Sequence, residues 1–341
     1  MSKYEVNIDL ANATKKEMSK RIDTQNNRVL NKFGAFSSLY DIKFDEYPNP
    51  VLVLKTEEPG SKQMLAIKYD RIEGICYDMI NHLINDCIVM GATPLTVQDA
   101  IICGKLDKNI ATRIVSAIAQ ACNEQGCVLT GGETSEQPGV LSNNVYVLTS
   151  SIVGIVDKSS IIDGSAISVG DSIIALESSG IHTNGYTLVR KIMDECTEIK
   201  NERIDGREFI DVILEPHRCY YQSTKESVRK QLISGMAHIT GGGIKENLNR
   251  ILPNNVDAEI DLSSYRIPSI FSLLKKYGNI SADEMLRTFN LGVGMTLVVP
   301  TNNIKEVIDN ALCKGVNAYV IGQIVSGKGQ VKCINRLNWC Y

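Results

Sequence analysis

Residues 78–103, DMINHLINDCIVMGATPLTVQDAIIC, contain the change of hydrophobic pattern that decides the fold. Apolar residues over 78–90 predict a helix, which ends at Gly91 before the Thr93-Pro94 pair. The apolar, β-branched run at 95–103 then predicts a strand. Helices and strands that alternate in this way build layered α/β folds.

The alternation continues on both sides of this stretch. In the first half we expect strands at 51–55, 64–69, 127–130 and 144–156 and helices at 11–24 and 108–124. In the second half we expect strands at 172–177, 258–262, 293–299 and 318–326 and helices at 184–194, 224–234, 245–250 and 303–314. The sequence therefore predicts an α/β, α+β-layered fold.

Turn residues at 157–171, among them Asp163-Gly164, indicate a domain boundary. We expect one domain at residues 1–163 and a second at 164–341, which suits a chain of 341 residues. The polar residues 1–32 are expected to form a mobile arm, or a surface helix over 11–24.

Composition excludes several classes of protein. With 36 basic and 39 acidic residues, the net charge of −3 gives no footprint for nucleic acid or an anionic membrane. Ten cysteines without a CxxC pair favour reduced core thiols and a reducing compartment. The polar N-terminus resembles no secretory signal, and no apolar run is long enough to cross a bilayer.

A polar stripe follows the helix predicted at 78–90. Asp78, His82, Asn85 and Asp86 share one face, and apolar residues fill the positions between them. One interpretation is an amphipathic helix whose polar face is exposed to solvent. The other is a carboxylate face that lines a cleft, because the helix has no Lys, Arg or Glu and carboxylate oxygens suit Mg²⁺. Asp78 and Asp86 would lie about 12 Å apart along the axis and would serve different ligand groups.

Glycine-rich turns mark four further segments. In LTGGET the paired Gly131 and Gly132 after a strand would let amides approach an anion, with Glu133 and Thr134 as further ligands. The others are SSGIHTNGY at 178–186, AHITGGG at 237–243 and RTFNLGVGM at 287–295, and the first two open helices. Helix starts favour phosphate, although glycines can also simply turn or hinge the chain.

Other nucleotide and metal signatures are missing. The chain has four histidines, none with Cys–His zinc spacing, and it has no GxSxG, P-loop or Rossmann glycine motif. A nucleotide would have to be held in some other way.

Together these segments resemble the phosphoribosylformylglycinamidine cyclo-ligase family, also called aminoimidazole ribonucleotide synthetase. The resemblance runs in order from Asn7-Ile8-Asp9 and Phe33-Gly34-Ala35 to the final strand. Its most specific pieces are ND-x4-GA-x-P (85–94), GKLD (104–107), GGETSEQPG (131–139), IIDGS (161–165), SSGIHTNGYTLVRK (178–191), HITGGGIKENLNRILP (238–253) and RTFNLGVGM (287–295). The nucleotide-binding half is shared with selenophosphate synthetase, thiamine-monophosphate kinase and formylglycinamidine synthetase.

The resemblance implies a cytoplasmic homodimer of purine biosynthesis that uses ATP and Mg²⁺. Its N-terminal sheet would build a barrel-like dimer core, its C-terminal mixed sheet would be flanked by helices, and ATP would lie between the domains. The implied reaction is ATP-dependent ring closure of formylglycinamidine ribonucleotide, a small phosphorylated substrate, to aminoimidazole ribonucleotide. The formamide oxygen is first phosphorylated, and a C–N bond then forms.

The resemblance also implies site residues. The metal ligands would be Glu57, Asp78, Asp86 and Glu133, and the nucleotide would further contact Gly60, Lys62, Gly131, Gly132 and Thr134. The substrate would contact Ser179, His182, Asn184, Gly185, His238, Gly241, Gly242 and Gly243. Lys62 and His182 are the expected catalytic residues, with His182 alternatively pinning its loop.

One segment departs from the family. Where the family has TDGVGTK, this chain has Thr56-Glu57-Glu58-Pro59-Gly60-Ser61-Lys62, and Pro59 removes an amide donor. The departure leaves room for another small-molecule ATP-dependent enzyme of the superfamily, such as a kinase or a selenophosphate synthetase, or for a non-catalytic paralogue.

Overall fold

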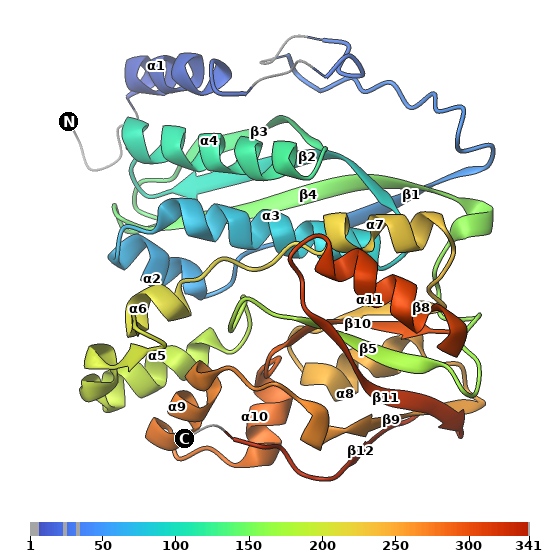
Figure 1. The fold of residues 1–341 in the computed structure, drawn as a ribbon. Coiled ribbons are helices and arrows are strands. Elements are labelled where there is room, and N and C mark those ends of the chain that lie inside the picture. Colours follow the sequence, from blue (N-terminus) through green and yellow to red (C-terminus); the bar gives the residue numbers. More distant parts are fainter. Residues whose placement is uncertain (1–6, 23–25, 32–34, 340–341) are drawn as a thin grey trace. The chain divides into compact units, whose positions relative to one another are not determined.

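The computed structural model describes residues 7–22, 26–31 and 35–339. The chain folds into two compact units. The first unit contains residues up to 159 except 89–91, and the second contains 89–91 and the residues from 160 onward. Each unit has its own sheet and helices, so the expected mixed α/β fold with two sheets is confirmed (Figure 1).

The sheet of the first unit has four strands. Their order is β1 (Pro50–Glu57), β4 (Tyr146–Asp157), β2 (Thr93–Cys103) and β3 (Val128–Glu136). β4 runs antiparallel to both of its neighbours, whereas β2 and β3 are parallel. A parallel pair needs a crossover, and the helix α4 (Lys108–Glu124) supplies it.

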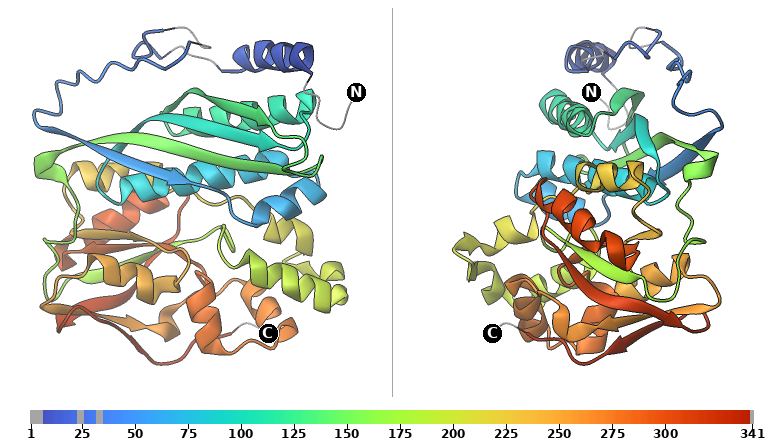
Figure 2. Two further views of the ribbon diagram at one scale, coloured as in Figure 1. Left: turned by 180° about the vertical axis from the view of Figure 1, so that it is seen from behind. Right: turned by 45° about the vertical axis from the view of Figure 1, so that its right-hand side comes forward.

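Helices cover one face of this sheet. α3 (Ile72–Ile88) packs on β1 and β4, α4 packs on β3, and α1 (Ile8–Ser19) packs on α4. Thirteen of the 17 residues of α3 are buried, which excludes the interpretation of this helix as an amphipathic surface helix. Among the described residues of this unit, Figure 2 shows no helix on the opposite face. Burial alternates along β1, and its residues Leu52 and Leu54 are exposed.

Two predictions for the first unit were wrong. The strand expected at 64–69 is the helix α2 (Lys62–Lys68), because Lys62, Leu65 and Ala66 are buried at helical spacing. A run of six residues is too short to distinguish the 3.6-residue period of a helix from the two-residue period of a strand. The strand expected to end at residue 130 continues to Glu136, because a register shift beside Gly131, with φ +156°, keeps the glycine pair in the ladder.

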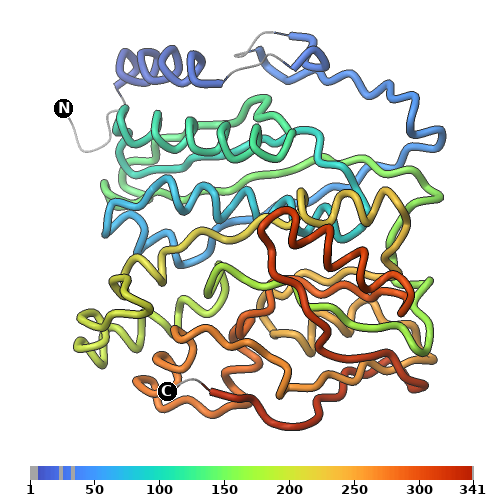
Figure 3. Tube along the Cα trace, in the orientation of Figure 1, coloured from blue at the N-terminus to red at the C-terminus, as the bar shows by residue number. Residues whose placement is uncertain are grey.

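The sheet of the second unit has six strands. Their order is β12 (Val331–Ile334), β9 (Val256–Asp261), β11 (Ala318–Ser326), β5 (Ser172–Glu177), β10 (Val293–Val299) and β8 (Gly235–His238). β10 is antiparallel to both β5 and β8, so β5 and β8 end at the same edge of the sheet. Figure 3 shows the C-terminal β12 returning beside β9, to which it is parallel.

Seven α-helices and a short hairpin complete the described part of the second unit. The helices are α5 (Tyr186–Glu195), α6 (Phe209–Ile213), α7 (Tyr221–Arg229), α8 (Gly243–Leu248), α9 (Ser269–Tyr277), α10 (Ala282–Thr288) and α11 (Ile304–Leu312), and the hairpin is β6 (Arg203–Ile204) with β7 (Arg207–Glu208). The helix expected at 224–234 ends five residues early, because Gln231 turns with φ +55°. The sequence did not predict α6, α9 or α10, nor the strands β6, β7, β8 and β12.

The N-terminal segment forms the helix α1, three residues earlier than expected. Asn7 caps it by accepting the Leu10 amide at 3.0 Å. Phe33 and Gly34, which carry part of the resemblance, lie outside the described residues.

The described cysteines are free thiols. No disulfide joins the nine described cysteines, five of which are buried. Among the described helices, none is long and apolar enough to cross a membrane.

Candidate active site

A buried ion pair joins α2 and α3 in the first unit. Lys62 Nζ donates to Asp78 Oδ1 at 2.8 Å, and the two side chains are 1% and 0% exposed. α2 and α3 supply one residue each, so the pair fixes the two helices to each other. Both residues were predicted to contact the nucleotide, and this geometry gives them a structural role as well.

A second charged cluster joins β1 to α3. Lys55 Nζ lies 3.0 Å from Glu57 Oε2 and 3.0 Å from Asp86 Oδ2. His82 Nε2 lies 3.7 Å from the same two oxygens. Two predicted metal ligands therefore converge on one cation, here an ammonium. Burial alone lowers the pKa of Lys55, but hydrogen bonds to Asp86 and Glu57 outweigh it, so the pKa of Lys55 is raised.

Asp99 lies in the same row of the sheet, and the sequence motifs did not point to it. Across the strands Glu57 pairs with Ser150, Ser150 with Asp99, and Asp99 with Gly132. Ser150 Oγ contacts Met79 Sδ of α3 at 3.5 Å, which identifies the helix-covered face. Glu57 and Asp99 are two strand spacings apart, roughly 10 Å. Burial raises the pKa of Asp99 to about 7, and such a shift beside a cavity indicates a functional residue.

The glycine pair packs against this carboxyl group. A Cβ on Gly132 would lie 2.1 Å from Asp99 Oδ1, so a side chain there would displace the carboxylate. Gly131, Gly132, Glu133 and Asp99 line a cavity of about 320 Å³. Glu133 Oε1 accepts the Thr134 amide at 3.0 Å. The residues Gly131, Gly132 and Glu133 therefore border a cavity from within a strand rather than from a turn, and their contact with a nucleotide stays a prediction.

The predicted substrate loop after β5 is held by Asn290. The Asn290 Nδ2 donates to the Gly180 and Ile181 carbonyls at 2.9 and 3.1 Å, and its Oδ1 accepts from Ser178 Oγ at 3.1 Å. Gly185 leaves room for Phe289, whose ring would lie 2.3 Å from an added Cβ. The motif RTFNLGVGM thus shapes the loop that contains Ser179, His182 and Asn184.

The glycine turn after β8 is held in a similar way by Asn247. Its Nδ2 donates to the carbonyls of Thr240, Gly241 and Gly243 at 3.3, 3.1 and 2.8 Å. The turn adjoins the β5 loop, because a Cβ on Gly241 would lie 3.2 Å from Asn184 Oδ1. Two segments that are some 55 residues apart in sequence therefore lie side by side in the second unit.

Three buried histidines lie together in and beside these loops. His217 Nε2 and His238 Nε2 are 2.9 Å apart, and the rings of His182 and His217 stack with centroids 3.8 Å apart. His182 has φ +67°, and its Nε2 accepts the Ser179 amide at 3.2 Å. This bond supports the interpretation that His182 pins its loop. His217 was not predicted, because it lies outside the glycine motifs.

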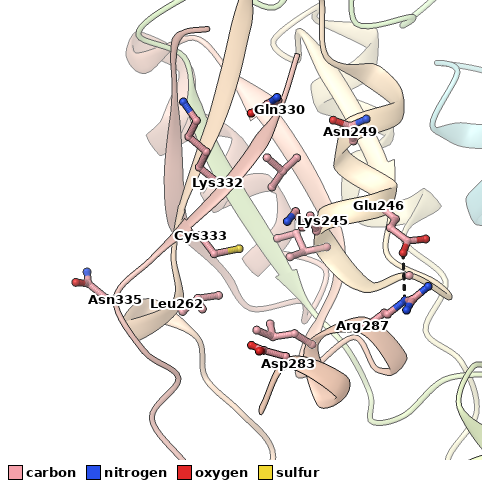
Figure 4. A pocket seen from close by; sticks show the side chains of 14 residues that line it. Lys245, Glu246, Asn249, Leu262, Asp283, Arg287, Gln330, Lys332, Cys333 and Asn335 are labelled. Atoms are coloured by element: carbon pink, nitrogen blue, oxygen red, sulfur yellow. Dashed lines mark ion pairs between the residues drawn. The ribbon is translucent and has the colours of Figure 1, made fainter. Parts of the chain in front are cut away.

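A larger cavity, of about 1080 Å³, lies between α8, α10 and β12 (Figure 4). Gly242 lines it, with Lys245, Arg287 and Lys332. Arg287 pairs with Glu246 at 3.5 Å and Lys332 with Asp257 at 2.6 Å, so carboxylates neutralise two of these cations.

Comparisons with known proteins agree with this architecture. Family models described as the N-terminal and C-terminal domains of AIR synthase related protein match residues 42–156 and 168–334. Together the two models cover most of the chain, which is therefore an AIR synthase-related protein. Phosphoribosylformylglycinamidine cyclo-ligase of Bacillus cytotoxicus is 41% identical over 95% of this chain and 94% of its own, and that of Geotalea daltonii is 39% identical over 96% of each. The chain belongs to the phosphoribosylformylglycinamidine cyclo-ligase family.

Solved structures share the fold at low identity. Thiamine-monophosphate kinase from Stenotrophomonas maltophilia superposes with a TM-score of 0.71 at 15% identity, covering 95% of this chain and 96% of its own. Hydrogenase maturation protein HypE in complex with ATP superposes with a TM-score of 0.63 at 14% identity, covering 93% and 88%. At these identities the likeness concerns the fold alone.

Proposed function

We propose that this chain closes the imidazole ring of aminoimidazole ribonucleotide from formylglycinamidine ribonucleotide and ATP. The observation that carries the proposal is the convergence of Glu57 and Asp86 on one cation, in a member of the cyclo-ligase family. The products besides the imidazole are ADP and phosphate. Curated relatives with this name cover almost the whole chain, which favours this reaction over those of the kinases that share the fold.

In the first step the formamide oxygen attacks the γ-phosphorus of ATP. This oxygen is a poor leaving group, and phosphorylation allows it to depart later as phosphate. Glu57, Asp86, Asp99 and Glu133 are the carboxylates proposed to hold Mg²⁺–ATP, and the oxygens of Glu57 and Asp86 already converge as hard cations require. When bound, Mg²⁺ neutralises charge on the phosphates. The Lys62–Asp78 pair keeps the helices beneath in place.

In the second step the amidine nitrogen attacks the activated carbon, the C–N bond closes the ring, and phosphate leaves. The attack is intramolecular, so the protein mainly has to hold a folded substrate conformer. We assign this task to the loops of the second unit, with Ser179, Asn184 and Gly185 on one side and Gly241–Gly243 on the other. His182 lies within the β5 loop and positions it through the Ser179 amide, and His238 lies at the end of β8.

Substitution of Asp86 tests the site. Asp86→Ala should lower substrate-dependent ADP release by at least about a hundredfold, because it removes a carboxylate that faces the proposed metal. The measurement is ADP formed with and without formylglycinamidine ribonucleotide. A kinase of another substrate, or a non-catalytic paralogue, would give no increase with this ribonucleotide.

The matched control is Asp45→Ala, which removes an exposed carboxylate of the same unit and should leave ADP release unchanged. If Asp86→Ala turns over like Asp45→Ala, Asp86 lies outside the site. The proposal places the enzyme in the cytoplasm, where the thiols would stay reduced.

A homodimer is the proposed assembly, formed through the open face of the first sheet. Leu52 and Leu54 are 48% and 69% exposed there. An apolar sheet face of a soluble protein is usually covered by another element or by a partner chain. Leu54→Glu should convert the dimer to a monomer in analytical ultracentrifugation, because an interface does not accept an unpaired buried charge. Leu312→Glu, an exposed leucine of the second unit, should leave the dimer intact. A wild-type monomer, or a dimeric Leu54→Glu variant, would refute this interface.

A further inference from the structure

The three buried histidines of the second unit come from separate segments. His182 lies in the loop after β5, His217 lies between α6 and α7, and His238 is the last residue of β8. Their exposed fractions are 2%, 1% and 6%. His217 is the central member, because its ring contacts both other rings, with centroid distances of 3.8 Å to His182 and 5.0 Å to His238.

A shared metal ion is the first function to weigh for such a group, since one nitrogen from each residue lies within 4.8 Å of the others. The orientation of the rings argues against it. Imidazoles bind an ion through lone pairs in the ring plane, and the His182 and His217 planes are stacked at only 21°. Parallel planes do not converge on one ion. In addition, His182 Nε2 already accepts the Ser179 amide.

The hydrogen bonds instead define the protonation pattern. A contact between two imidazole nitrogens at 2.9 Å needs one N–H donor and one acceptor, so His217 and His238 have complementary protonation at Nε2. His217 Nδ1 lies 3.4 Å from Thr183 Oγ1. His182 Nε2 accepts an amide, so this nitrogen carries no proton.

We propose that His217 is a positioning residue that couples the two substrate loops. It stacks on His182 in the β5 loop and bonds to His238, three residues before Gly241 of the glycine turn, so that neither imidazole can rotate independently. This role rests on the proposed function, because those loops are the ones assigned to the ribonucleotide. His217 contacts no reacting atom and acts through its two neighbours.

Three variants separate the interactions of His217. Two of them, His217→Gln and His217→Asn, are nearly isosteric with part of the imidazole. The amide of His217→Gln reaches the position of Nε2 and restores the bond to His238. The amide of His217→Asn reaches only the position of Nδ1, toward Thr183. His217→Phe keeps the stack on His182 and removes both bonds.

The first readout is the tautomer of each histidine, measured by ¹⁵N NMR on the full chain. In the wild type, His182 should show an unprotonated Nε2 and His238 a single tautomer. His238 should become a mixture in the Phe and Asn variants and remain single in the Gln variant. A single, unchanged His238 tautomer in all variants would overturn the proposal, as would binding of Zn²⁺ with loss of the stacked geometry.

The second readout is steady-state kinetics with formylglycinamidine ribonucleotide. The Phe and Asn variants should raise KM about tenfold with kcat within about threefold, because they loosen substrate-holding loops rather than remove a reacting group. The Gln variant should recover KM to within about threefold of the wild type. Equal KM values for Gln and Asn would contradict the coupling.

The two readouts distinguish the possible failures. If the wild type shows no turnover of the ribonucleotide, the proposed function fails, while the NMR pattern still decides whether His217 orients its neighbours. If the Phe and Asn variants do not fold, the Gln variant decides, because a mixed His238 tautomer in it would refute the proposal.

Discussion

Asp78→Ala is expected to lower the free energy of unfolding of the first unit by about 3–5 kcal/mol, because it removes the carboxylate that pairs with a buried ammonium. Lys62 Nζ has its carboxylate at 2.8 Å, and its side chain is 1% exposed, so water cannot replace the lost partner without opening the fold. The pair also links α2 to α3, the helix that carries Asp86 of the acidic site.

Urea unfolding followed by circular dichroism measures this cost. The double variant Lys62→Met/Asp78→Leu should lose less stability than the sum of the single losses, because it leaves no unpaired charge. The control Asp45→Ala should change the free energy of unfolding by less than about 0.5 kcal/mol. A loss below about 1 kcal/mol in Asp78→Ala would show that the buried pair does not hold the two helices.

Asp99→Asn is expected to stabilise the fold at pH 8 while abolishing catalysis. Burial raises the pKa of Asp99 to about 7, above its ordinary value near 3.8, so the folded state resists ionisation. The carboxyl group therefore favours folding below about pH 4, and this contribution is lost as the pH rises through about 7. At pH 8 the amide should be more stable than the wild type by roughly 2–4 kcal/mol, and at pH 4 the difference should vanish.

The activity of the same variant should fall at least about a hundredfold, because an amide cannot supply the charge that Mg²⁺–ATP needs. Thermal unfolding at pH 4 and pH 8 and ADP release at pH 8 are the measurements. Asp107→Asn, at the exposed cap of α4, is the control, and it should change stability by less than about 1 kcal/mol at both pH values, because Asn caps helices about as well as Asp. A variant that is active, or that is less stable than the wild type at pH 8, would remove Asp99 from the site.

The fold was largely predictable because most of its helices and strands have a clear hydrophobic pattern along their whole length. α4 was predicted to the residue, and β5, β10 and β11 were as well, since turn residues bound each run. α2 was missed because seven residues show too little periodicity, and its buried Lys62 appears polar in sequence. The extension of β3 was missed because paired glycines usually end strands, whereas here they make room for Asp99.

Sequence patterns located part of the candidate site. Glu57 and Asp86 were selected, but their shared partner Lys55 was not, although its spacing of two residues from Glu57 places both on one face of a strand. Asp99 could have been recognised, because it is an acidic residue in a strand of mainly apolar residues. No sequence pattern marks His217, because only the fold brings the segment before α7 against the ends of β5 and β8.

Oxygen transfer tests the central claim most directly. Formylglycinamidine ribonucleotide labelled with ¹⁸O in its formyl group should, with Mg²⁺ and ATP, yield one ¹⁸O atom in each phosphate released, with aminoimidazole ribonucleotide and ADP in equal amounts. Phosphate without ¹⁸O, or ADP release that does not depend on this ribonucleotide, would contradict the proposed reaction.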